Sequence, residues 1–176
     1  MTDPMPDVVA KRFAVLTGSV NCFKCGAPTP VAAIAVADHR EAWDAGDEGL
    51  DLVWEHCPEP ALLGYIRWIN PEASVALEVS APQLRMQVSM TAGETYLGNA
   101  CQACGTLQGD WFLHKPEAPF FPQSDEDADA LGVQWLDVPI QAVADCGTSS
   151  WLDDLLERRG DYVVPVRPRR SKTTRA

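Results

Sequence analysis

Hydrophobic and polar positions near the start of the chain predict two strands joined by a short turn. The segment from Lys11 to Val20 carries apolar side chains among small residues, which is typical of a strand. Residues 31–37 form an unbroken apolar run that predicts a second strand, and two cysteines occupy the turn at residues 21–26. The charged, glycine-containing segment 38–56 that follows predicts irregular structure at the surface.

In the middle of the chain, apolar residues first recur at helical spacing and then alternate in part with polar residues. Apolar residues recur at helical spacing between Pro60 and Pro71: Leu62, Leu63, Ile66 and Ile69. We therefore expect a short amphipathic helix that Pro71 ends. From residue 83 to 96, polar and apolar residues alternate in part, and Gly93 supplies a turn before a second cysteine pair. Residues 111–114 are then expected to form an exit strand, so the order strand, turn and strand occurs twice.

The last third of the chain predicts a capped helical turn, a strand and a helix. Ser124 can cap a turn over residues 124–132 whose first positions are acidic, and Gly132 suits the left-handed position after its end. A strand over residues 133–140 and a helix from residue 150 to Gly160 complete the pattern. The mixture of predicted strands and helices indicates an α+β fold.

The chain has 176 residues and a formal net charge of −11, which is divided unevenly. Residues 158–176 contain seven of the fourteen basic residues and one acidic residue, a net charge of +6, which leaves −17 on residues 1–157. A body this acidic is unsuited to a phosphate backbone, so nucleic-acid binding would be confined to the tail. We predict one domain over residues 1–160 and a basic, disordered tail over residues 161–176.

The N-terminus and the hydropathy predict a cytoplasmic protein with no membrane span. The first seven residues contain neither a positive segment nor an apolar stretch, unlike a secretory signal. The longest apolar run, Val31 to Ala37, has seven residues, far below the ~20 that span a bilayer. In a reducing compartment, the six cysteines are expected to bind metal or act in redox chemistry rather than form a disulfide framework.

Four of the cysteines form two C-x-x-C-G motifs, one starting at Cys22 and one starting at Cys101. The two-residue spacing lets both sulfurs of a turn face one ion, and the glycine allows a tight turn that aims amide N–H groups at the thiolates. Four thiolates around one cation form the tetrahedral arrangement typical of structural zinc. We predict a zinc-ribbon-like, β-rich core with two knuckles, an inserted helical segment and a C-terminal helix. Its single zinc ion would have four ligands: Cys22, Cys25, Cys101 and Cys104.

Three alternatives use the same cysteines. Thioredoxin-like redox chemistry normally has one C-x-x-C at a helix N-terminus, whereas both pairs here lie between predicted strands. Iron in a rubredoxin-like site has the same geometry, although zinc is the commoner ion, and two disulfides would require an oxidising compartment. A site closed by four protein ligands has no position for water, so its metal would be structural. Metal removal or Cys22→Ser is therefore expected to unfold much of the domain.

The segments around both motifs extend the pattern. Residues 22–31 read C-x-K-C-G-x-x-T-P-V, and residues 99–114 read N-x-C-x-x-C-G-x-x-Q-G-D-x-F-L-H. This combination resembles a group of uncharacterised bacterial zinc-ribbon-type proteins, and the likeness covers roughly a third of the chain. One departure is Ala100, where a bulky or polar residue is common. The resemblance implies a metal-binding ribbon with an insertion and implies no activity.

Two further groups of residues are candidates for a site. Asp110 and His114 would share one face of the predicted exit strand, where they could form a polar site or support the knuckle. His39, the neighbouring His56 and Cys57, and Cys146 could form another metal or thiol site. The simpler interpretation of these cysteines is that they are buried or surface thiols without a shared function.

These observations support three hypotheses from different classes of protein. The first is a non-enzymatic protein whose zinc ribbon organises a domain that presents a surface to a protein partner. The alternative is a nucleic-acid-associated protein that uses the basic C-terminal tail. A further alternative is a hydrolase built around Asp110 and His114. The acidic body argues against the second hypothesis, and the lack of a visible nucleophile, phosphate loop or open metal site argues against the third.

Overall fold

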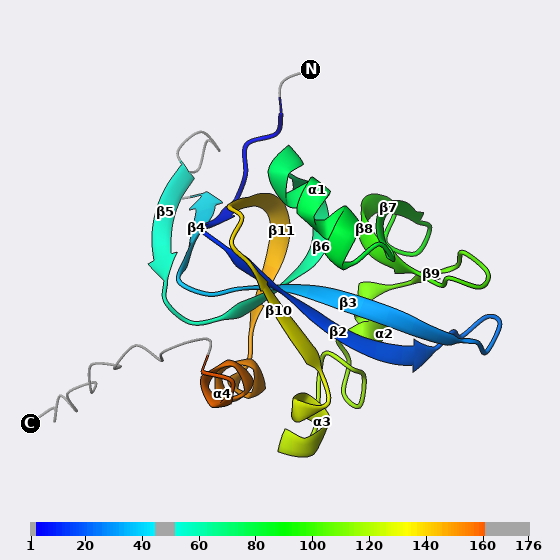
Figure 1. Ribbon diagram of the computed structural model, residues 1–176. Helices are drawn as coiled ribbons and strands as arrows, with labels where there is room; N and C mark the ends of the chain where they lie inside the picture. Colours follow the sequence, from blue (N-terminus) through cyan, green and yellow to red (C-terminus); the bar gives the residue numbers. More distant parts are fainter. Residues whose placement is uncertain (1–2, 45–51, 161–176) are drawn as a thin grey trace, which may run out of the picture.

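Two antiparallel sheets form the framework of the computed structural model, which describes residues 3–44 and 52–160 (Figure 1). The large sheet has the strand order β10-β2-β3-β6-β11-β1-β4-β5, and the small sheet has the order β7-β8-β9. The strands are β1 Val8–Ala10, β2 Phe13–Asn21, β3 Pro28–Val36, β4 His39–Asp44, β5 Leu52–Cys57, β6 Ala61–Ile69, β7 Leu84–Ser89, β8 Glu94–Ala100, β9 Leu107–Gln108, β10 Gly132–Leu136 and β11 Ile140–Thr148. The helices are α1 Pro71–Ser80, α2 Asp110–Leu113, α3 Asp125–Asp129 and α4 Ser150–Arg158.

Both faces of the large sheet are buried in its central strands. Successive residues of β2 alternate between two hydrophobic clusters: Phe13 and Val15 belong to one, and Ala14 and Leu16 belong to the other. The first cluster includes buried residues of α1, and the second includes the apolar face of α4. Because successive side chains of a strand point to opposite faces, a strand buried on both sides has a continuous apolar run. This explains the unbroken run that predicted β3.

The segment predicted as a helix over residues 62–69 belongs to strand β6, so that prediction is wrong. Leu63 and Ile66 lie in the same core cluster although they are three residues apart. Between them, Tyr65 has a φ of 46° and breaks the strand alternation, and the register with β11 shifts at this level. The irregularity produces a three-residue spacing that imitates a helical period. A helix, α1, begins at Pro71 instead, where proline is favoured in the first turn.

Two other segments also differ from their predictions. Residues 38–56, predicted to be irregular, contain β4 and most of β5, which pair with each other at one edge of the large sheet, while residues 45–51 lie outside the described residues. Their charged composition suits an edge, where side chains stay partly exposed. Residues 111–114, predicted as an exit strand, follow Asp110 in the one-turn helix α2 and its C-cap. The strand that leaves the second knuckle is β9, which has only two residues.

The C-terminal third follows its prediction more closely. Ser124 caps α3, because its Oγ accepts a hydrogen bond from the amide of Asp127 at 3.2 Å. The predicted left-handed Gly132 is instead the first residue of β10, and the strand predicted over residues 133–140 is divided between β10 and β11. The helix predicted from residue 150 is α4, and Gly160 beyond it has a φ of 69°.

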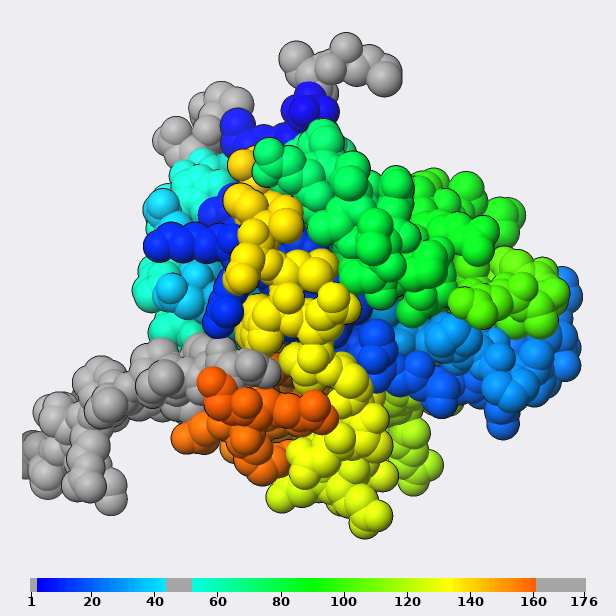
Figure 2. Space-filling model, in the orientation of Figure 1, coloured from blue at the N-terminus to red at the C-terminus, as the bar shows by residue number. Residues whose placement is uncertain are grey.

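The helices α3 and α4 lie beside each other at the lower edge of the molecule (Figure 2). Arg158 of α4 forms ion pairs with Asp125 at 3.2 Å and with Asp129 at 2.9 Å. These are acidic residues of α3, so one arginine neutralises part of a strongly acidic helix. The pairs are exposed, and their contribution to stability is expected to be small.

The zinc-ribbon-like core predicted from the sequence is wrong, although the α+β class is roughly right. The organising element is an eight-stranded antiparallel sheet, and the cysteine turns are attached to strands β2–β3 and β8–β9. The predicted tail, residues 161–176, lies outside the described residues. Within the described segments, no helix combines the length and apolar character needed to cross a membrane.

Candidate metal centre

Both cysteine pairs lie in turns of the same geometry. The amide of Gly26 donates to the carbonyl of Cys22, and the amide of Gly105 donates to that of Cys101, at 2.8 Å in each case. Both glycines have a φ of 72°, in the left-handed region that a residue with a Cβ rarely adopts. The glycine of each C-x-x-C-G motif is therefore required by the backbone of the turn.

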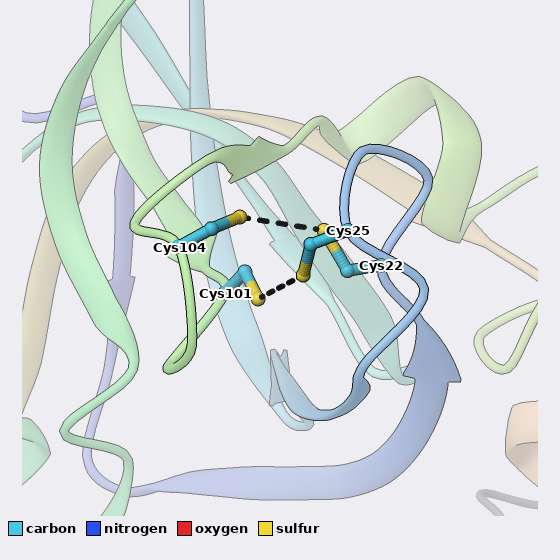
Figure 3. A group of neighbouring side chains, drawn as sticks. All are labelled: Cys22, Cys25, Cys101 and Cys104. Carbon is cyan, nitrogen blue, oxygen red and sulfur yellow. Dashed lines mark hydrogen bonds between the residues drawn. The ribbon is translucent and has the colours of Figure 1, made fainter.

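The fold brings the four cysteines together from these two turns (Figure 3). The Sγ atoms of Cys22 and Cys104 are 3.7 Å apart, as are those of Cys25 and Cys101. All four sulfurs lie within 4.8 Å of one another. Sulfurs placed tetrahedrally at about 2.3 Å from one ion are about 3.8 Å apart, so the separations fit a tetrathiolate site. The distances are far longer than a disulfide bond of about 2.05 Å, and the cysteines are free.

Two polar side chains link the turns by crossed hydrogen bonds to sulfur. Thr29, which follows the first turn, donates its hydroxyl to Sγ of Cys101 in the second turn at 3.3 Å. Gln108, which follows the second turn, donates from Nε2 to Sγ of Cys22 in the first turn at 3.4 Å. Both side chains are buried. Each turn thus supplies a donor that stabilises negative charge on a thiolate of the other turn.

The turns also change the acidity of the thiols. The Thr29 hydroxyl, followed by backbone amides of the second turn, lowers the pKa of Cys101 to about 6. The amides of Cys25 and Lys24 lower the pKa of Cys22. For Cys25, the amide of Ala27 lowers the pKa, but desolvation and the neighbouring cysteines outweigh it and raise the value to about 11. The cluster therefore favours some thiolates before any cation binds, and a cation is needed to stabilise four of them together.

Asn99 connects the second turn to the large sheet. This residue is 1% exposed, its Oδ1 accepts from the amide of Ala32 at 2.7 Å, and its Nδ2 donates to the carbonyl of Ala32 at 2.9 Å. Strand β6 pairs with this edge of β3 only from Ile34 onwards. The amide of Asn99 therefore takes the place of a neighbouring strand at Ala32 and joins β8 to β3.

The donor set fits a soft or borderline metal ion and little else. Four sulfurs suit zinc or iron, because thiolates are preferred by soft and borderline ions rather than by calcium or magnesium. A tetrathiolate site has no open coordination position, so a metal held there cannot bind and activate water. What this arrangement can do is join two distant parts of the chain, since 75 residues separate Cys25 from Cys101.

Asp110 and His114 come together on a helical turn rather than on a strand face. Both line a cavity of about 450 Å³ between β6, β11, α2 and α4. Asp110 accepts a hydrogen bond from the amide of Tyr65 at 2.8 Å, and desolvation raises its pKa to about 6. Desolvation lowers the pKa of His114 to about 4, so this imidazole is neutral at pH 7. The buried Oγ of Ser149 lies in the lining of the same cavity. Among the described residues, no hydrogen bond joins Asp110, His114 and Ser149.

The second candidate group is divided by the structure. His39 and Cys146 lie close together, and Glu41 lies with them. His56 is exposed and forms a 2.6 Å contact with Asp38 instead. Cys57 lies across from His39 in the pairing of β4 with β5, but outside the cluster that could hold an ion.

Sequence reasoning did not assign the roles of four residues at these sites: Thr29, Glu41, Asn99 and Gln108. A signal existed for two of them, because Thr29 and Gln108 each lie seven positions after the first cysteine of a motif. That equivalence is visible in the sequence only when the two turns are superimposed on each other. Asn99 begins the second cysteine motif, but nothing in the motif indicated its contact with β3, and nothing local marked Glu41.

Comparison with known proteins gives no match for this chain. No protein-family model matches the chain, and neither a curated protein nor a solved structure matches it. The resemblance to zinc-ribbon-type proteins is therefore supported only by the paired cysteine turns. The class of protein is a β-rich domain with four clustered cysteines that can bind one metal ion.

Proposed function

We propose that this protein is a non-enzymatic protein-interaction module in which one structural zinc ion holds the two cysteine turns together. The four-sulfur cluster carries this proposal, because its spacing fits a closed tetrahedral site. The zinc would fix the relative position of strands β2–β3 and β8–β9. The surface around the turns would then have one defined shape that a partner can recognise.

An exposed aromatic surface lies directly beside the cluster. We call it the knuckle surface, and it consists of Phe23, Val88, Met90, Trp111 and Phe112. Phe23 of the first turn stacks on Phe112 beyond the second turn, with ring centroids 6.1 Å apart. The two rings are 69% and 55% exposed, and Trp111 is 70% exposed. All five residues line a concavity of about 650 Å³. A grouped set of exposed aromatic side chains is typical of a protein-binding site.

The charge near this surface indicates the chemistry of the partner. Lys24 follows Phe23, and Nζ of Lys115 lies 5.5 Å from the ring centroid of Phe112. These cations lie in a body whose residues 1–157 carry a net charge of −17. A segment with apolar side chains and flanking acidic residues would complement both the aromatic rings and the two lysines. We therefore propose an acidic, apolar segment of another protein as the partner.

A peptide-display experiment tests this assignment. Zinc-loaded protein would be used to select from a random peptide library, and the recovered peptides would be synthesised and titrated by fluorescence anisotropy. We expect apolar peptides rich in Asp and Glu, and at least about tenfold weaker binding to the Phe23→Ser/Phe112→Ser variant. Trp43→Ser is the matched control, since Trp43 is 53% exposed on β4, far along the sheet order from β2 and β3.

Two outcomes would overturn the proposed function. One is recovery of no enriched peptide class from the zinc-loaded protein. The other is equal binding of the recovered peptides to the wild type and to the double variant. A preference for basic peptides would likewise contradict the assigned role of the lysines. Binding that persists after zinc removal would show that the ion does not organise the surface.

A hydrolase remains a second candidate because of one observation. Asp110, neutral His114 and the buried hydroxyl of Ser149 line a common cavity. Turnover of small activated esters that is lost in His114→Gln and kept in His56→Gln would support this function. Equal rates in both variants would exclude it. The hypothesis of nucleic-acid binding through the basic tail concerns residues 161–176, which lie outside the described residues, and it remains a prediction.

A further inference from the structure

A second group of metal-binding side chains lies away from the four-cysteine cluster. His39 and Glu41 are two positions apart on β4, so their side chains point to the same face of that strand. Cys146 belongs to β11, and the short strand β1 lies between β4 and β11 in the sheet. One potential ligand atom from each of the three residues lies within 4.8 Å of the others.

The strand register does not by itself bring these residues together. Strand β1 pairs with β11 only from Ile140 to Ala142, and its Val8 lies between Ala142 and Glu41, so Cys146 is four residues beyond the part of β11 that β1 joins to β4. The ligand atoms nevertheless lie within 4.8 Å of one another, so the fold rather than adjacent strand positions brings them together. The three donors thus converge on one region, as the ligands of a bound ion do.

His39 provides an independent sign that a partner is missing. Its side chain is completely buried, and its Nε2 lies 2.7 Å from Oε1 of Glu41. The other ring nitrogen, Nδ1, is buried and has no hydrogen-bond partner among the described residues. Buried polar atoms are almost always satisfied, and an exception indicates an absent ligand, water or ion. The contact with Glu41 accounts for one nitrogen only, and the Cys146 thiol shares the same carboxylate as a hydrogen-bond partner.

The chemistry of the three groups selects one class of ligand. An imidazole, a carboxylate and a thiolate together suit a borderline divalent transition ion such as zinc. One carboxylate and one thiolate balance the charge of a divalent cation, so the site would be neutral when filled. We propose that His39, Glu41 and Cys146 form a second metal site that binds a divalent transition ion of the zinc type.

This second site would differ from the four-cysteine cluster in its coordination. Three protein ligands leave a fourth position for water or for a small anionic ligand. The four-cysteine cluster has no such position. If the protein has any metal-dependent chemistry, the second site is the place where the metal can reach an external molecule. The proposal does not depend on the protein-interaction function.

The experiment counts zinc ions on the full-length protein. Protein dialysed against zinc in the presence of a competing chelator of moderate affinity would be analysed by native mass spectrometry and by elemental analysis. We expect two zinc ions on the wild type and one on Cys146→Ala. Cys146 is only half-buried, so its substitution is expected to leave the fold intact, and circular dichroism checks this. His39→Gln is the second variant and is expected to retain one ion.

A matched control and a spectroscopic readout separate this site from the cysteine cluster. His56→Gln removes an exposed histidine next to Cys57 and is expected to retain both ions. Cobalt added to wild type that holds one zinc ion, in the four-cysteine cluster, should fill the open second site and give an absorption spectrum with single-thiolate intensity, about a quarter of that of a tetrathiolate site. A single zinc ion on the wild type would overturn the proposal. Two ions on Cys146→Ala, or a cobalt spectrum without thiolate absorption, would overturn it as well.

Discussion

The two cysteine turns have the same backbone geometry but different support. The first turn closes the hairpin β2–β3, whose strands pair over eight residue pairs up to Asn21 and Pro28. The second turn joins β8 to β9, which pair over only two positions. The first turn is therefore positioned by a regular hairpin, whereas the second depends on tertiary contacts. Those contacts come from Asn99, from Gln108 and from the sulfur cluster.

Loss of one sulfur ligand is the largest expected effect. Cys101→Ser should weaken zinc binding by about 3–4 kcal/mol, roughly 300-fold, because structural zinc sites bind with about 10–16 kcal/mol shared among four ligands. Competition with a chromophoric chelator measures the affinity. Cys57→Ser is the matched control and should leave the tightly bound zinc in place. Equal zinc affinity in Cys101→Ser and wild type would exclude the cluster as the metal site.

Metal removal should affect the two turns unequally. The sequence alone predicted unfolding of much of the domain, but both core clusters are built on the large sheet and the helices packed against it, and neither includes any of the four cysteines. We expect amide exchange in β8–β9 to accelerate by about 100-fold on chelation, while β2–β3 changes little. Hydrogen exchange with mass spectrometry measures both strand pairs in one sample. Equal acceleration of both would show that the hairpin does not support the first turn.

The hydrogen bonds of Asn99 should contribute nearly as much as the metal to the stability of the second turn. Asn99→Ala leaves the buried amide and carbonyl of Ala32 without partners, at a cost of about 1–3 kcal/mol each before relaxation. We expect the free energy of unfolding to fall by about 3 kcal/mol in chemical denaturation. Asn21→Ala, at the exposed end of β2, should change it by less than about 0.5 kcal/mol. Similar losses in both variants would contradict the special role of Asn99.

Asp110 begins α2, which follows the second turn and β9, and it has no counterpart after the first turn; its titration gives a pH-dependent effect. Its folded pKa is raised from 3.8 to about 6, so between these values the native state holds a proton that the unfolded chain loses. Stability therefore falls as pH rises through this window. Asp110→Asn abolishes this fall and should be about 2 kcal/mol more stable than wild type above pH 6, with a smaller difference below pH 4.

Denaturation at pH 4 and pH 7 measures this prediction. The exposed Asp137→Asn is the matched control and should follow the wild type at both values. A wild-type stability that does not decline relative to Asp110→Asn between these two pH values would show that the carboxyl group is not desolvated as the fold implies.

Removal of the Thr29 hydroxyl, which links the first turn to the second by a hydrogen bond, should have the smallest effect. Thr29→Val removes the hydrogen bond to Cys101, so the pKa of the Cys101 thiol should rise. Zinc affinity should fall by about tenfold, as is typical when a residue that hydrogen-bonds to a metal ligand is lost. The comparison is Thr106→Val, whose hydroxyl lies 3.2 Å from the exposed Cys104, with an expected loss of less than threefold. Equal losses would show that burial of Thr29 is unimportant.

The sequence predicted the chemistry of the cluster better than it predicted the fold around it. Cysteine spacing is local, so each C-x-x-C-G motif specified its own turn, including the left-handed glycine. The helix wrongly predicted over residues 62–69 shows the limit, because the apolar spacing there reflects a strand irregularity at Tyr65 and burial on two faces. Hydrophobic periodicity cannot distinguish a helix from a strand when the strand is both irregular and fully buried.

By itself, the sequence determined which residues could bind metal and how each turn is shaped, because both depend on residues a few positions apart. Only the tertiary structure decided that the two turns share one cluster, with Thr29 and Gln108 crossing between them. It also brought His39 and Cys146, 107 residues apart in the chain, to within ligand distance of Glu41. Such contacts depend on strand order and register, which are set by long-range packing and are not encoded in any local pattern.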